Sequence, residues 1–394
     1  MNTDEAPAVR ADVPGTFAHS VLAERHPALV RQVRDATPYP PAVRGALDGL
    51  LAEITDGTVA PLPPDAHDAR QWDAWGAGTA VGRPWYDLTF LWGESYFYRR
   101  LLGAVGYFAP GVRQGLDPFA PFKDAELRGT AVDEELAALD ALAEHPERER
   151  ADALLGAALW GNRADLGFRI TAGETAPGGA AQLVADERER LWDMLPPGDD
   201  PAATVHLIAD NAARELVPDL LLLDHLLHTG RAGSAVLHVK PYPYYVSDAT
   251  AADADAALRR LAAAGGAAGE AGRRLWDAVA EGRLAIGAHP FFCAPFGYAE
   301  MPDDLRRHLA TATVTLLKGD LNYRRLVGDR LWQPTTPFAD RAAHFPSPVA
   351  ALRTLKSDVV TGVAPATVAA LDASGEPWRV TGTHALVQVA GADA

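Results

Sequence analysis

The second half of the chain alternates short β-rich runs with helical stretches, and this alternation restricts the fold more than any other feature. The β-rich runs lie at 204–209, 235–239, 284–287, 312–317, 350–355 and 384–389. Helical patterns lie between them at 253–264, 270–281 and 303–310. Strands that alternate with helices are typical of a largely parallel sheet with both faces covered. The sequence therefore predicts an α/β fold with a mainly parallel sheet.

The first half of the chain has a different texture. Residues 1 to about 200 carry apolar side chains at helical spacing, for example at 44–54, 90–108, 133–143 and 147–160. Pro196, Pro197 and Gly198, followed by two aspartates, mark a boundary. We therefore expect a mainly helical N-terminal domain over 1–200 and an α/β metal-binding catalytic core over 201–394.

Charge limits the partners of the chain. The net charge is −16, and such an acidic chain repels a phosphate backbone. Nucleic acid is therefore not expected as a partner, whereas a small anionic molecule remains possible if basic residues gather in one pocket. The most apolar stretch, 216–227, is interrupted by Pro218, Asp219 and Asp224 and is too short to span a bilayer. We expect no membrane segment and a cytoplasmic location.

Cysteine and histidine give little indication of a metal site. Cys293 is the only cysteine, so no intrachain disulfide can form and a cysteine-based zinc site would lack ligands. The 12 histidines show no ligand spacing, and isolated histidines are more often structural. The abundance of Ala, Arg and Asp with little Lys is typical of a GC-rich bacterial genome.

Polar side chains follow three of the expected strands at the point where each strand ends. Asp210 and Asn211 follow 205–209, and Gly319 and Asp320 follow 314–317. Lys240 follows 235–239, with Asp248 a short loop later. Open α/β sheets bind ligands beyond the carboxyl ends of their strands. These residues are therefore expected to share one pocket.

The acidic residues of this pocket favour a cation. Asp210, Asn211 and Asp248 offer the oxygen ligands that Mg²⁺, Mn²⁺ and similar ions prefer. Glu215 lies four residues after Asn211, so a helix starting there would place both on one face. The alternative role for Asp210, Asn211 and Asp248 is to cap the helices that follow, and spacing alone favours that alternative.

The basic residues and the remaining carboxylates suit a phosphorylated ligand. Arg324 supplies a planar fork for phosphate oxygens, and Lys356 could neutralise a phosphoryl oxygen. Asp320 could position a sugar hydroxyl or support the metal. The alternative is a set of solvated surface side chains. Glu94, on an aromatic-rich helix, and Asn162, after a helix end, could also reach the pocket.

Taken in order, these motifs resemble the damage-control phosphatases, in the branch of the acidic-residue carboxyl-methyltransferase-like proteins. The shared features are an Asp-Asn pair with a Glu four residues after the Asn, an Asp after Val-Ser, and the segment Gly-Asp-Leu-Asn-Tyr-Arg at 319–324. The lysine of Arg-Thr-Leu-Lys at 353–356, the helix 94–100 and the Leu-Trp-Gly-Asn of 159–162 also match. The likeness runs from about residue 20 to 390. Ala213 departs from it, because relatives usually carry glycine there.

The resemblance implies a three-layer α/β/α Rossmann-like core behind a helical N-terminal part. It implies an enzyme that hydrolyses phosphomonoesters of small metabolites, notably sugar phosphates, with one divalent cation, Mn²⁺, Co²⁺, Ni²⁺ or Mg²⁺. The implied metal ligands are Asp210, Asn211 and Asp248. Either Glu215 or Asp320 could act as general base. The residues implied at the catalytic and substrate positions are Asp210, Asn211, Glu215, Asp248, Asp320, Leu321, Asn322, Tyr323, Arg324, Lys356, Lys240, Asn162 and Glu94.

Two other functions compete with this one. The first is an S-adenosylmethionine-dependent carboxyl methyltransferase, but the usual nucleotide-binding fold would want a glycine fingerprint between an early strand and helix. Gly76, Gly78 and Gly82 precede any clear βαβ unit, and 265–269 lies between helices. The second is a non-catalytic metal- or sugar-phosphate-binding protein, and retention of the acidic ligands with Arg324 and Lys356 argues against it. The sequence leaves the physiological substrate, the metal and the oligomeric state open.

Overall fold

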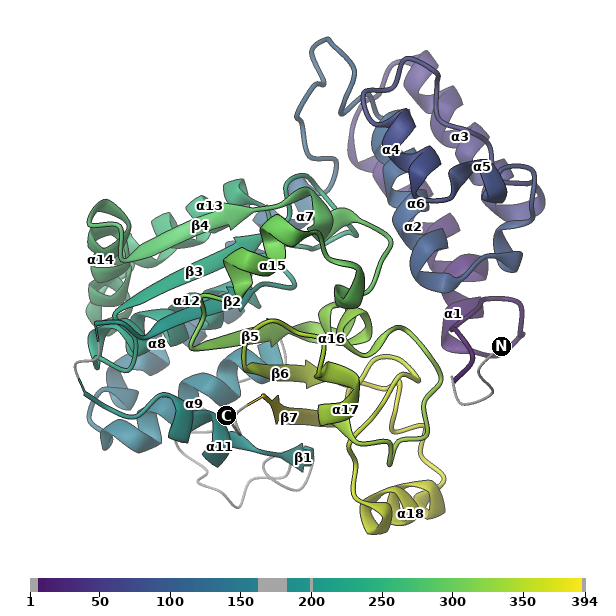
Figure 1. Ribbon diagram of the computed structural model, residues 1–394. Helices are drawn as coiled ribbons and strands as arrows, with labels where there is room; N and C mark the ends of the chain where they lie inside the picture. Colours follow the sequence, from purple (N-terminus) through teal and green to yellow (C-terminus); the bar gives the residue numbers. More distant parts are fainter. Residues whose placement is uncertain (1–5, 162–182, 199–200, 392–394) are drawn as a thin grey trace.

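The computed structural model describes residues 6–161, 183–198 and 201–391 (Figure 1). Within these residues the chain forms a helical N-terminal part and a seven-stranded sheet in the order β1-β7-β6-β5-β2-β3-β4. The strands are β1 (Leu183–Asp186), β2 (Thr204–Ile208), β3 (Ser234–Val239), β4 (Leu284–Ala288), β5 (Val314–Lys318), β6 (Val349–Thr354) and β7 (Ala385–Ala390).

The sheet is mainly parallel, as predicted. Neighbouring strands run parallel throughout these described strands except at β6 and β7, which pair antiparallel. The central strands β5 and β6 are buried at every residue. Such continuous burial is typical of strands covered on both faces, where polar alternation disappears. The sequence accordingly shows apolar runs at these positions instead of an alternating pattern.

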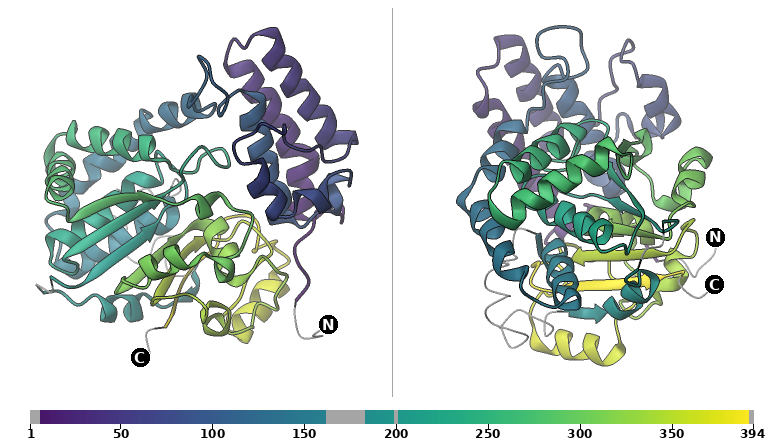
Figure 2. Two further views of the ribbon diagram at one scale, coloured as in Figure 1. Left: turned by 45° about the horizontal axis from the view of Figure 1, so that its top comes forward. Right: turned by 90° about the vertical axis from the view of Figure 1, so that its left-hand side faces the viewer.

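Two hydrophobic cores lie on the two faces of the sheet. Successive residues of β7 point to opposite faces, since Leu386 packs in one core and Val387 in the other. The core containing Val387 is closed by helices α8, α9, α11, α12, α13 and α14. The core containing Leu386 is closed by α15, α16 and α17 together with the N-terminal helices. The resulting α/β/α layers confirm the predicted fold class (Figure 2).

The helices of the sheet-covering layers have the following bounds. On the first face they are α8 (Thr130–Leu142), α9 (Glu147–Trp160), α11 (Arg188–Met194), α12 (Leu216–His228), α13 (Ala251–Ala262) and α14 (Gly266–Ala280). On the second face they are α15 (Asp303–Leu309), α16 (Gly319–Val327) and α17 (Phe338–Ala342), with the 3₁₀ turns η6 (Pro290–Cys293) and η7 (Tyr298–Glu300). Helix α18 (Pro365–Ser374) has no buried residue, and only its partly buried Val368 and Leu371 pack against the core of the second face.

The N-terminal part is helical over the described residues, as expected. Its elements are α1 (Phe17–Ser20), the π-helical turn η1 (Val21–Arg25), α2 (His26–Ala36), α3 (Pro41–Asp56), α4 (Ala69–Ala74), α5 (Ala77–Ala80), the 3₁₀ turn η2 (Trp85–Asp87), α6 (Phe90–Ala104) and α7 (Ala120–Leu127). Helix α6 is the most deeply buried of these, and its aromatic residues pack at helical spacing as the sequence indicates. Figure 1 shows this bundle on the side of the sheet where β5 and β6 end.

Some boundaries differ from the sequence prediction. The stretch 265–269, expected between two helices, lies mostly inside α14, because α14 already begins at Gly266. The strand β1 precedes residue 201 and pairs with β7, while α8 and α9 pack against α14 and α12. The sheet therefore draws on segments from both sides of the predicted boundary, and the division into two domains at residue 200 stays a prediction. Among the described residues, none of the helices combines the length and apolar character that a bilayer crossing needs.

Candidate functional site

The predicted polar clusters meet at one edge of the sheet. Strands β6, β5, β2 and β3 are neighbours in that order and run parallel, so their carboxyl ends lie side by side. Lys356 follows β6, Asp320 follows β5, Asp210 follows β2 and Lys240 follows β3. The connections from β2 and β5 lead to opposite sides of the sheet, which makes this edge a topological switch point where α/β folds bind ligands.

The loop after β3 folds back onto the loop after β2. Asn211 and Asp248 pair as an isolated antiparallel bridge. The backbone N–H of Ala249 donates to the carbonyl of Asp210 at 2.9 Å, and that of Ala212 donates to the carbonyl of Ser247 at 2.6 Å. These backbone contacts fix Asp248 beside the Asp210-Asn211 pair.

None of the three proposed ligands serves as a helix cap. Helix α12 has Glu215 at its N-cap position, several residues after Asp210 and Asn211. Helix α13 is capped by Thr250, whose backbone N–H and hydroxyl both donate to Asp253 Oδ2, at 2.8 and 2.7 Å. The capping alternative therefore fails for Asp210, Asn211 and Asp248.

Asn211 donates hydrogen bonds to the carboxylates of both Asp210 and Glu215. Its Nδ2 donates to Glu215 Oε2 at 2.9 Å and to Asp210 Oδ2 at 3.2 Å. Its Oδ1 accepts a hydrogen bond from Ser247 Oγ at 2.5 Å and retains a second lone pair. Asn211 and Glu215 therefore lie together as expected, but by this hydrogen bond and not on a helix face, because α12 begins only after Glu215. Ser247 is a supporting residue that the sequence did not indicate beyond its place beside Asp248.

Gly319 permits the close approach of β5 to Asp210. Its φ of +83° lies in the left-handed region, and a Cβ built on it would stand 1.9 Å from Asp210 Oδ2. Gly161 plays a similar part at Glu215, because a Cβ there would stand 2.5 Å from Glu215 Cγ. Both glycines leave room for a carboxylate of the site.

Two buried carboxylates face each other with few donors. Burial raises the pKa of Asp210 well above its usual value, and the charges of Asp248 and Glu215 raise it further. Burial also raises the pKa of Asp248 to about 6, against the opposing charges of Lys240 and Lys123. Asp248 Oδ2 lies 3.4 Å from Lys240 Nζ, but neither atom makes a hydrogen bond within the described part of the chain.

This donor set fits a divalent cation. Two carboxylates and an amide oxygen are hard ligands, and a cation would relieve the repulsion between the two buried carboxylates. The buried Oδ2 of Asp248 would also gain a partner, which a buried polar atom needs. These observations support the predicted ligands without identifying the metal.

Asp320 is held differently, by a basic residue that the sequence pattern did not single out. Arg353 is fully buried, and its Nε and Nη2 lie 2.9 and 2.7 Å from Asp320 Oδ1. Ser357 Oγ donates to the same oxygen at 3.0 Å. Burial alone would raise the pKa of Asp320, but the charges of Arg353 and Arg324 outweigh it and lower the pKa. Asp320 therefore stays ionised, and its Oδ1 is occupied by protein donors.

The two predicted phosphate ligands differ in exposure. The side chain of Lys356 is 45 % exposed, and its Nζ lies 3.8 Å from Glu215 Oε1. Arg324 is buried, with Nε donating to Asp329 Oδ1 at 2.6 Å and Nη1 donating to Glu94 Oε2 at 3.3 Å. Lys356 is thus free to meet an incoming anion, whereas the fork of Arg324 is engaged by carboxylates.

The remaining predicted residues of α16 are buried. Asn322 Nδ2 donates to the carbonyls of Ala209 and Lys318, at 3.1 and 2.9 Å, and so joins the ends of β2 and β5. Tyr323 places its hydroxyl 3.0 Å from Gln388 Oε1, and Leu321 packs against Tyr244 and Cys293. The three side chains thus contact other parts of the protein at this edge, and their place in substrate binding stays a prediction.

Glu94 connects the helical bundle to the site. Burial raises its pKa to about 7, against the charge of Arg324, and it accepts a hydrogen bond from the hydroxyl of Tyr245 at 3.0 Å. Tyr244, in the same loop, lies 2.5 Å from Ser95 Oγ. Asn162, the last of the predicted residues, lies outside the described residues.

One surface pocket lies away from the acidic edge. A pocket lined by Asp224, Arg274 and Arg283, among others, opens between α12 and α14 at the amino end of β4. That end of the sheet is opposite to the edge that carries Asp210. The acidic edge is identified as the candidate site by its side-chain chemistry and its position in the sheet topology.

Comparison with known proteins decides the family. The sequence profile of the damage-control phosphatase ARMT1-like domain matches residues 21–371. The chain belongs to this family. The damage-control phosphatase ARMT1 of Danio rerio is 29 % identical, over 96 % of this chain and 95 % of its own. That of Rattus norvegicus is 31 % identical, over 79 % of this chain and 76 % of its own. A DUF89 family protein from Pyrococcus horikoshii of known structure has a TM-score of 0.48 at 14 % identity, covering 94 % of this chain and 96 % of its own.

Membership of the damage-control phosphatases confirms the predicted family and the predicted class of enzyme, a metal-dependent phosphatase. The Danio rerio and Rattus norvegicus relatives are vertebrate proteins, so the bacterial origin suggested by composition stays a prediction, as does the cytoplasmic location.

Proposed function

We propose that this chain hydrolyses phosphomonoesters of small metabolites, sugar phosphates or related compounds, at the edge formed by β6, β5, β2 and β3. The observation that carries the proposal is the meeting of Asp210, Asn211 and Asp248 in a buried place, where the pKa of Asp210 is raised and the buried Oδ2 of Asp248 lacks a hydrogen-bond donor. Exposed Lys356 at the same edge supplies a positive charge for the phosphoryl group.

Asp210, Asn211 and Asp248 would hold one divalent cation, Mn²⁺, Co²⁺, Ni²⁺ or Mg²⁺. Such an ion, when bound, supplies Lewis-acid polarisation of a phosphoryl oxygen and lowers the pKa of a water. The protein's own part is to keep the ligand oxygens in place. Gly319 does this by leaving space for Asp210, and Ser247 does it by holding the amide of Asn211.

Lys356 would balance the charge that spreads over the phosphoryl oxygens in a loose transition state. Its side chain is far more exposed than that of Arg324, and its contact with Glu215 at 3.8 Å is long enough to yield to a phosphate. Arg324 would act without touching the phosphate, because its nitrogens already donate hydrogen bonds to Asp329 and Glu94. We therefore expect Lys356 to contact the phosphate directly and Arg324 to position Glu94 and α16.

The two remaining carboxylates suit different tasks. Asp320 is fixed by Arg353 and Ser357 and has a lowered pKa, so it is a weak base but a good acceptor for a substrate hydroxyl. Glu215 makes fewer contacts, one to Asn211 and one to Lys356, and Gly161 packs closely against it without a side chain. We assign Glu215 to the orientation of the attacking water and Asp320 to the binding of substrate hydroxyls.

The methyltransferase alternative gains nothing from the fold. The turn after β2, where a glycine fingerprint would lie in a nucleotide-binding sheet, is Ala209 to Ala213 and contains no glycine. In place of glycines, this turn contains Asp210 and Asn211.

A chelation and add-back assay tests the proposed function. Protein freed of metal is assayed with p-nitrophenyl phosphate and with a panel of sugar phosphates, each with Mn²⁺, Co²⁺, Ni²⁺ or Mg²⁺. Asp210→Ala should lower kcat by roughly 100-fold or more, the loss expected when one main charge-holding group is removed. Asp124→Ala, which removes an exposed aspartate of α7, is the matched control and should retain wild-type turnover.

Three results would contradict the proposal. Wild-type turnover in Asp210→Ala would refute the metal ligands. Absence of phosphate release with every metal and ester would favour the non-catalytic binding protein. Micromolar binding of S-adenosylmethionine by calorimetry, together with methyl transfer to a carboxylate, would favour the methyltransferase.

A further inference from the structure

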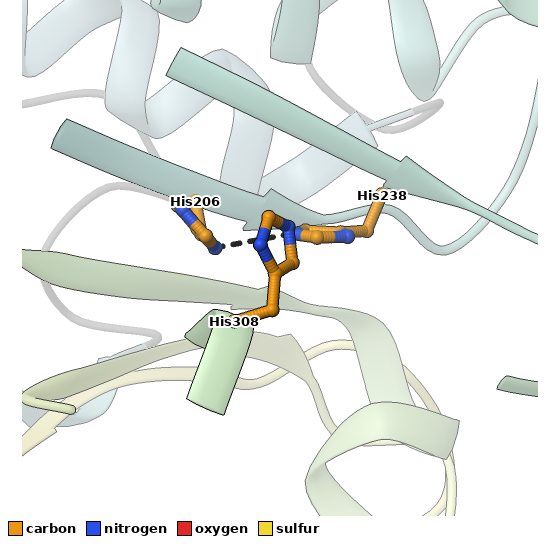
Figure 3. A group of neighbouring side chains, drawn as sticks. All are labelled: His206, His238 and His308. Atoms are coloured by element: carbon orange, nitrogen blue, oxygen red, sulfur yellow. Dashed lines mark hydrogen bonds between the residues drawn. The ribbon is translucent and has the colours of Figure 1, made fainter. Parts of the chain in front are cut away.

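Three histidines from three separate elements meet on the α15 side of the sheet (Figure 3). They are His206 of β2, His238 of β3 and His308 of α15. One ring nitrogen of each lies within 4.8 Å of those of the other two. The positions of these residues in the sequence give no sign of this, since His206 and His308 come from different halves of the α/β region.

The strand register brings the first two histidines together. His206 pairs with Val236, and Ile208 pairs with His238, so the two histidines are offset by two residues on one sheet face. Ile208 belongs to the core that α15 closes with Leu305 and Leu309. The same helix presents His308 to the pair, with ring centroids 4.9 Å from His206 and 5.3 Å from His238.

We propose that His206, His238 and His308 bind a transition-metal cation of the zinc type, at a site separate from the acidic edge. Neutral imidazole nitrogens suit Zn²⁺, Cu²⁺ and Ni²⁺, and three protein ligands with one open position are typical of accessible zinc sites. Zinc–nitrogen bonds of 2.0–2.1 Å in tetrahedral geometry place ligand nitrogens roughly 3.3 Å apart.

The observed distances approach that requirement. His238 Nε2 lies 3.1 Å from His206 Nδ1, so two of the three ligands already have the separation that a shared cation needs. The nitrogen of His308 must close in from within 4.8 Å. This movement is small for an exposed side chain near the end of a helix.

The competing explanation is a hydrogen bond between two neutral histidines. It accounts for the His206–His238 contact but not for the third ring, which makes no side-chain hydrogen bond within the described residues. Burial lowers the pKa of His206 to about 4 and lowers that of His238 well below its usual value, so both rings are neutral at physiological pH. Neutral imidazole is the form that binds metal.

Nearby His289 is already engaged and so is not counted as a ligand. Its Nε2 lies 3.2 Å from Asp304 Oδ2, and its Nδ1 accepts a hydrogen bond from the N–H of Phe291 at 3.1 Å. The fourth position of the proposed site therefore faces solvent beside exposed His308.

The bound cation would join α15 to β2 and β3. Along β2, His206 precedes Asp210 by four residues, which is about 13 Å in an extended strand, too far for one ion to be shared. The proposed site is thus a structural clamp on the two strands whose ends carry the acidic edge. Its occupancy is measurable without any assay of turnover.

The test is a Zn²⁺ titration of metal-free, full-length protein by calorimetry, in the presence of saturating Mg²⁺ to occupy the oxygen ligands. We expect one equivalent of Zn²⁺ to bind and to raise the thermal midpoint. His308→Ala should weaken that binding by more than about 100-fold, since even the outer-shell partners of metal ligands change affinity by 10- to 100-fold. Because His308 is exposed, this substitution should leave the fold intact.

His228→Ala is the matched control, because His228 is also an exposed histidine near a helix end but lies on α12. It should bind Zn²⁺ as the wild type does. A second variant, His238→Gln, should lose the same binding event. Cobalt provides an independent readout, since the visible spectrum of bound Co²⁺ should change in His308→Ala and not in His228→Ala. Equal Zn²⁺ affinity in the wild type and His308→Ala, or no Zn²⁺ binding by the wild type, would overturn the proposal.

Discussion

The strictest test of the acidic edge is the substitution Gly319→Ala, which adds one methyl group beside Asp210. In the observed backbone the new Cβ would lie 1.9 Å from Asp210 Oδ2 and 2.2 Å from its Cγ. Contacts of a Cβ below 3.0 Å do not occur in real structures. The carboxylate would therefore have to move by more than 1 Å, or the first turn of α16 would have to shift by a similar amount.

The expected loss follows from this displacement. A shift of about 1 Å in a group that positions the reacting atoms can cost about 100-fold in rate, which corresponds to about 2.7 kcal/mol. The metal affinity should fall as well, because Asp210 is a proposed ligand. In addition, alanine at a φ of +83° strains the backbone by roughly 1–2 kcal/mol.

Gly328→Ala separates strain from displacement. Gly328 ends the same helix at a φ of +97°, and a Cβ on it would have no heavy atom within 4 Å. It should share the loss of stability, about 1 °C in thermal midpoint per kcal/mol for a chain of this length, but keep turnover and metal binding. The measurements are kcat/KM for a phosphate ester, metal binding by calorimetry, and thermal midpoints of both variants.

Two outcomes would refute the reasoning. If Gly319→Ala keeps the wild-type kcat/KM and metal affinity, the approach of β5 to Asp210 does not organise the site. If Gly328→Ala loses activity to the same extent, backbone strain alone explains the effect and the contact with Asp210 is irrelevant.

Two further predictions concern stability. Ala213 adopts a φ of +52°, so Ala213→Gly should relieve strain and raise the free energy of unfolding by up to about 1 kcal/mol in a urea titration; a lower urea midpoint would contradict this. Burial raises the pKa of Glu94 from 4.5 to about 7, so the native state binds more protons than the unfolded state between these pH values, and the free energy of unfolding should fall across that window as pH rises. In metal-free protein the part due to Glu94 should be on the order of 3 kcal/mol, beside the contributions of Asp210 and Asp248, whose pKa values are also raised. Glu94→Gln should remove that part; an equal pH dependence in both proteins would show that Glu94 does not contribute.

Much of this arrangement follows from the sequence because strands and helices have different periods. The segments that form β2, β3 and β5 are mostly apolar, although His206, His238 and Thr315 lie within them. Asp210, Lys240 and Asp320 follow one or two residues after the ends of these strands. Once the strands are parallel neighbours, the positions of Asp210, Lys240 and Asp320 at one edge follow from topology. The order of the strands was not needed to expect a shared pocket.

The partners of those residues could not be predicted in the same way. Arg353 points from β6 to Asp320, and Asn322 joins the ends of β2 and β5, because of side-chain directions that local pattern does not encode. The phosphate fork expected of Arg324 is directed to Asp329, only five residues later but reached through a backbone with a φ of +48° at Asp329. A local sequence reading sees the charge of Arg324 but not the carboxylates that engage it.

The same limit applies to the histidines, and it changes how metal dependence should be measured. The three histidines meet only after β2 pairs with β3 and α15 folds over them, so no spacing in the sequence could reveal them. Oxygen ligands favour Mg²⁺ and Mn²⁺, while imidazole accepts Zn²⁺, Ni²⁺ and Cu²⁺. A Ni²⁺ titration of turnover would therefore sum two effects, ligand binding at the acidic edge and clamping of the strands that carry it. The variant His308→Ala lacks the second effect, while Asp210, Asn211 and Asp248 stay intact. The metal dependence of turnover in that variant is therefore the preference of the acidic edge itself.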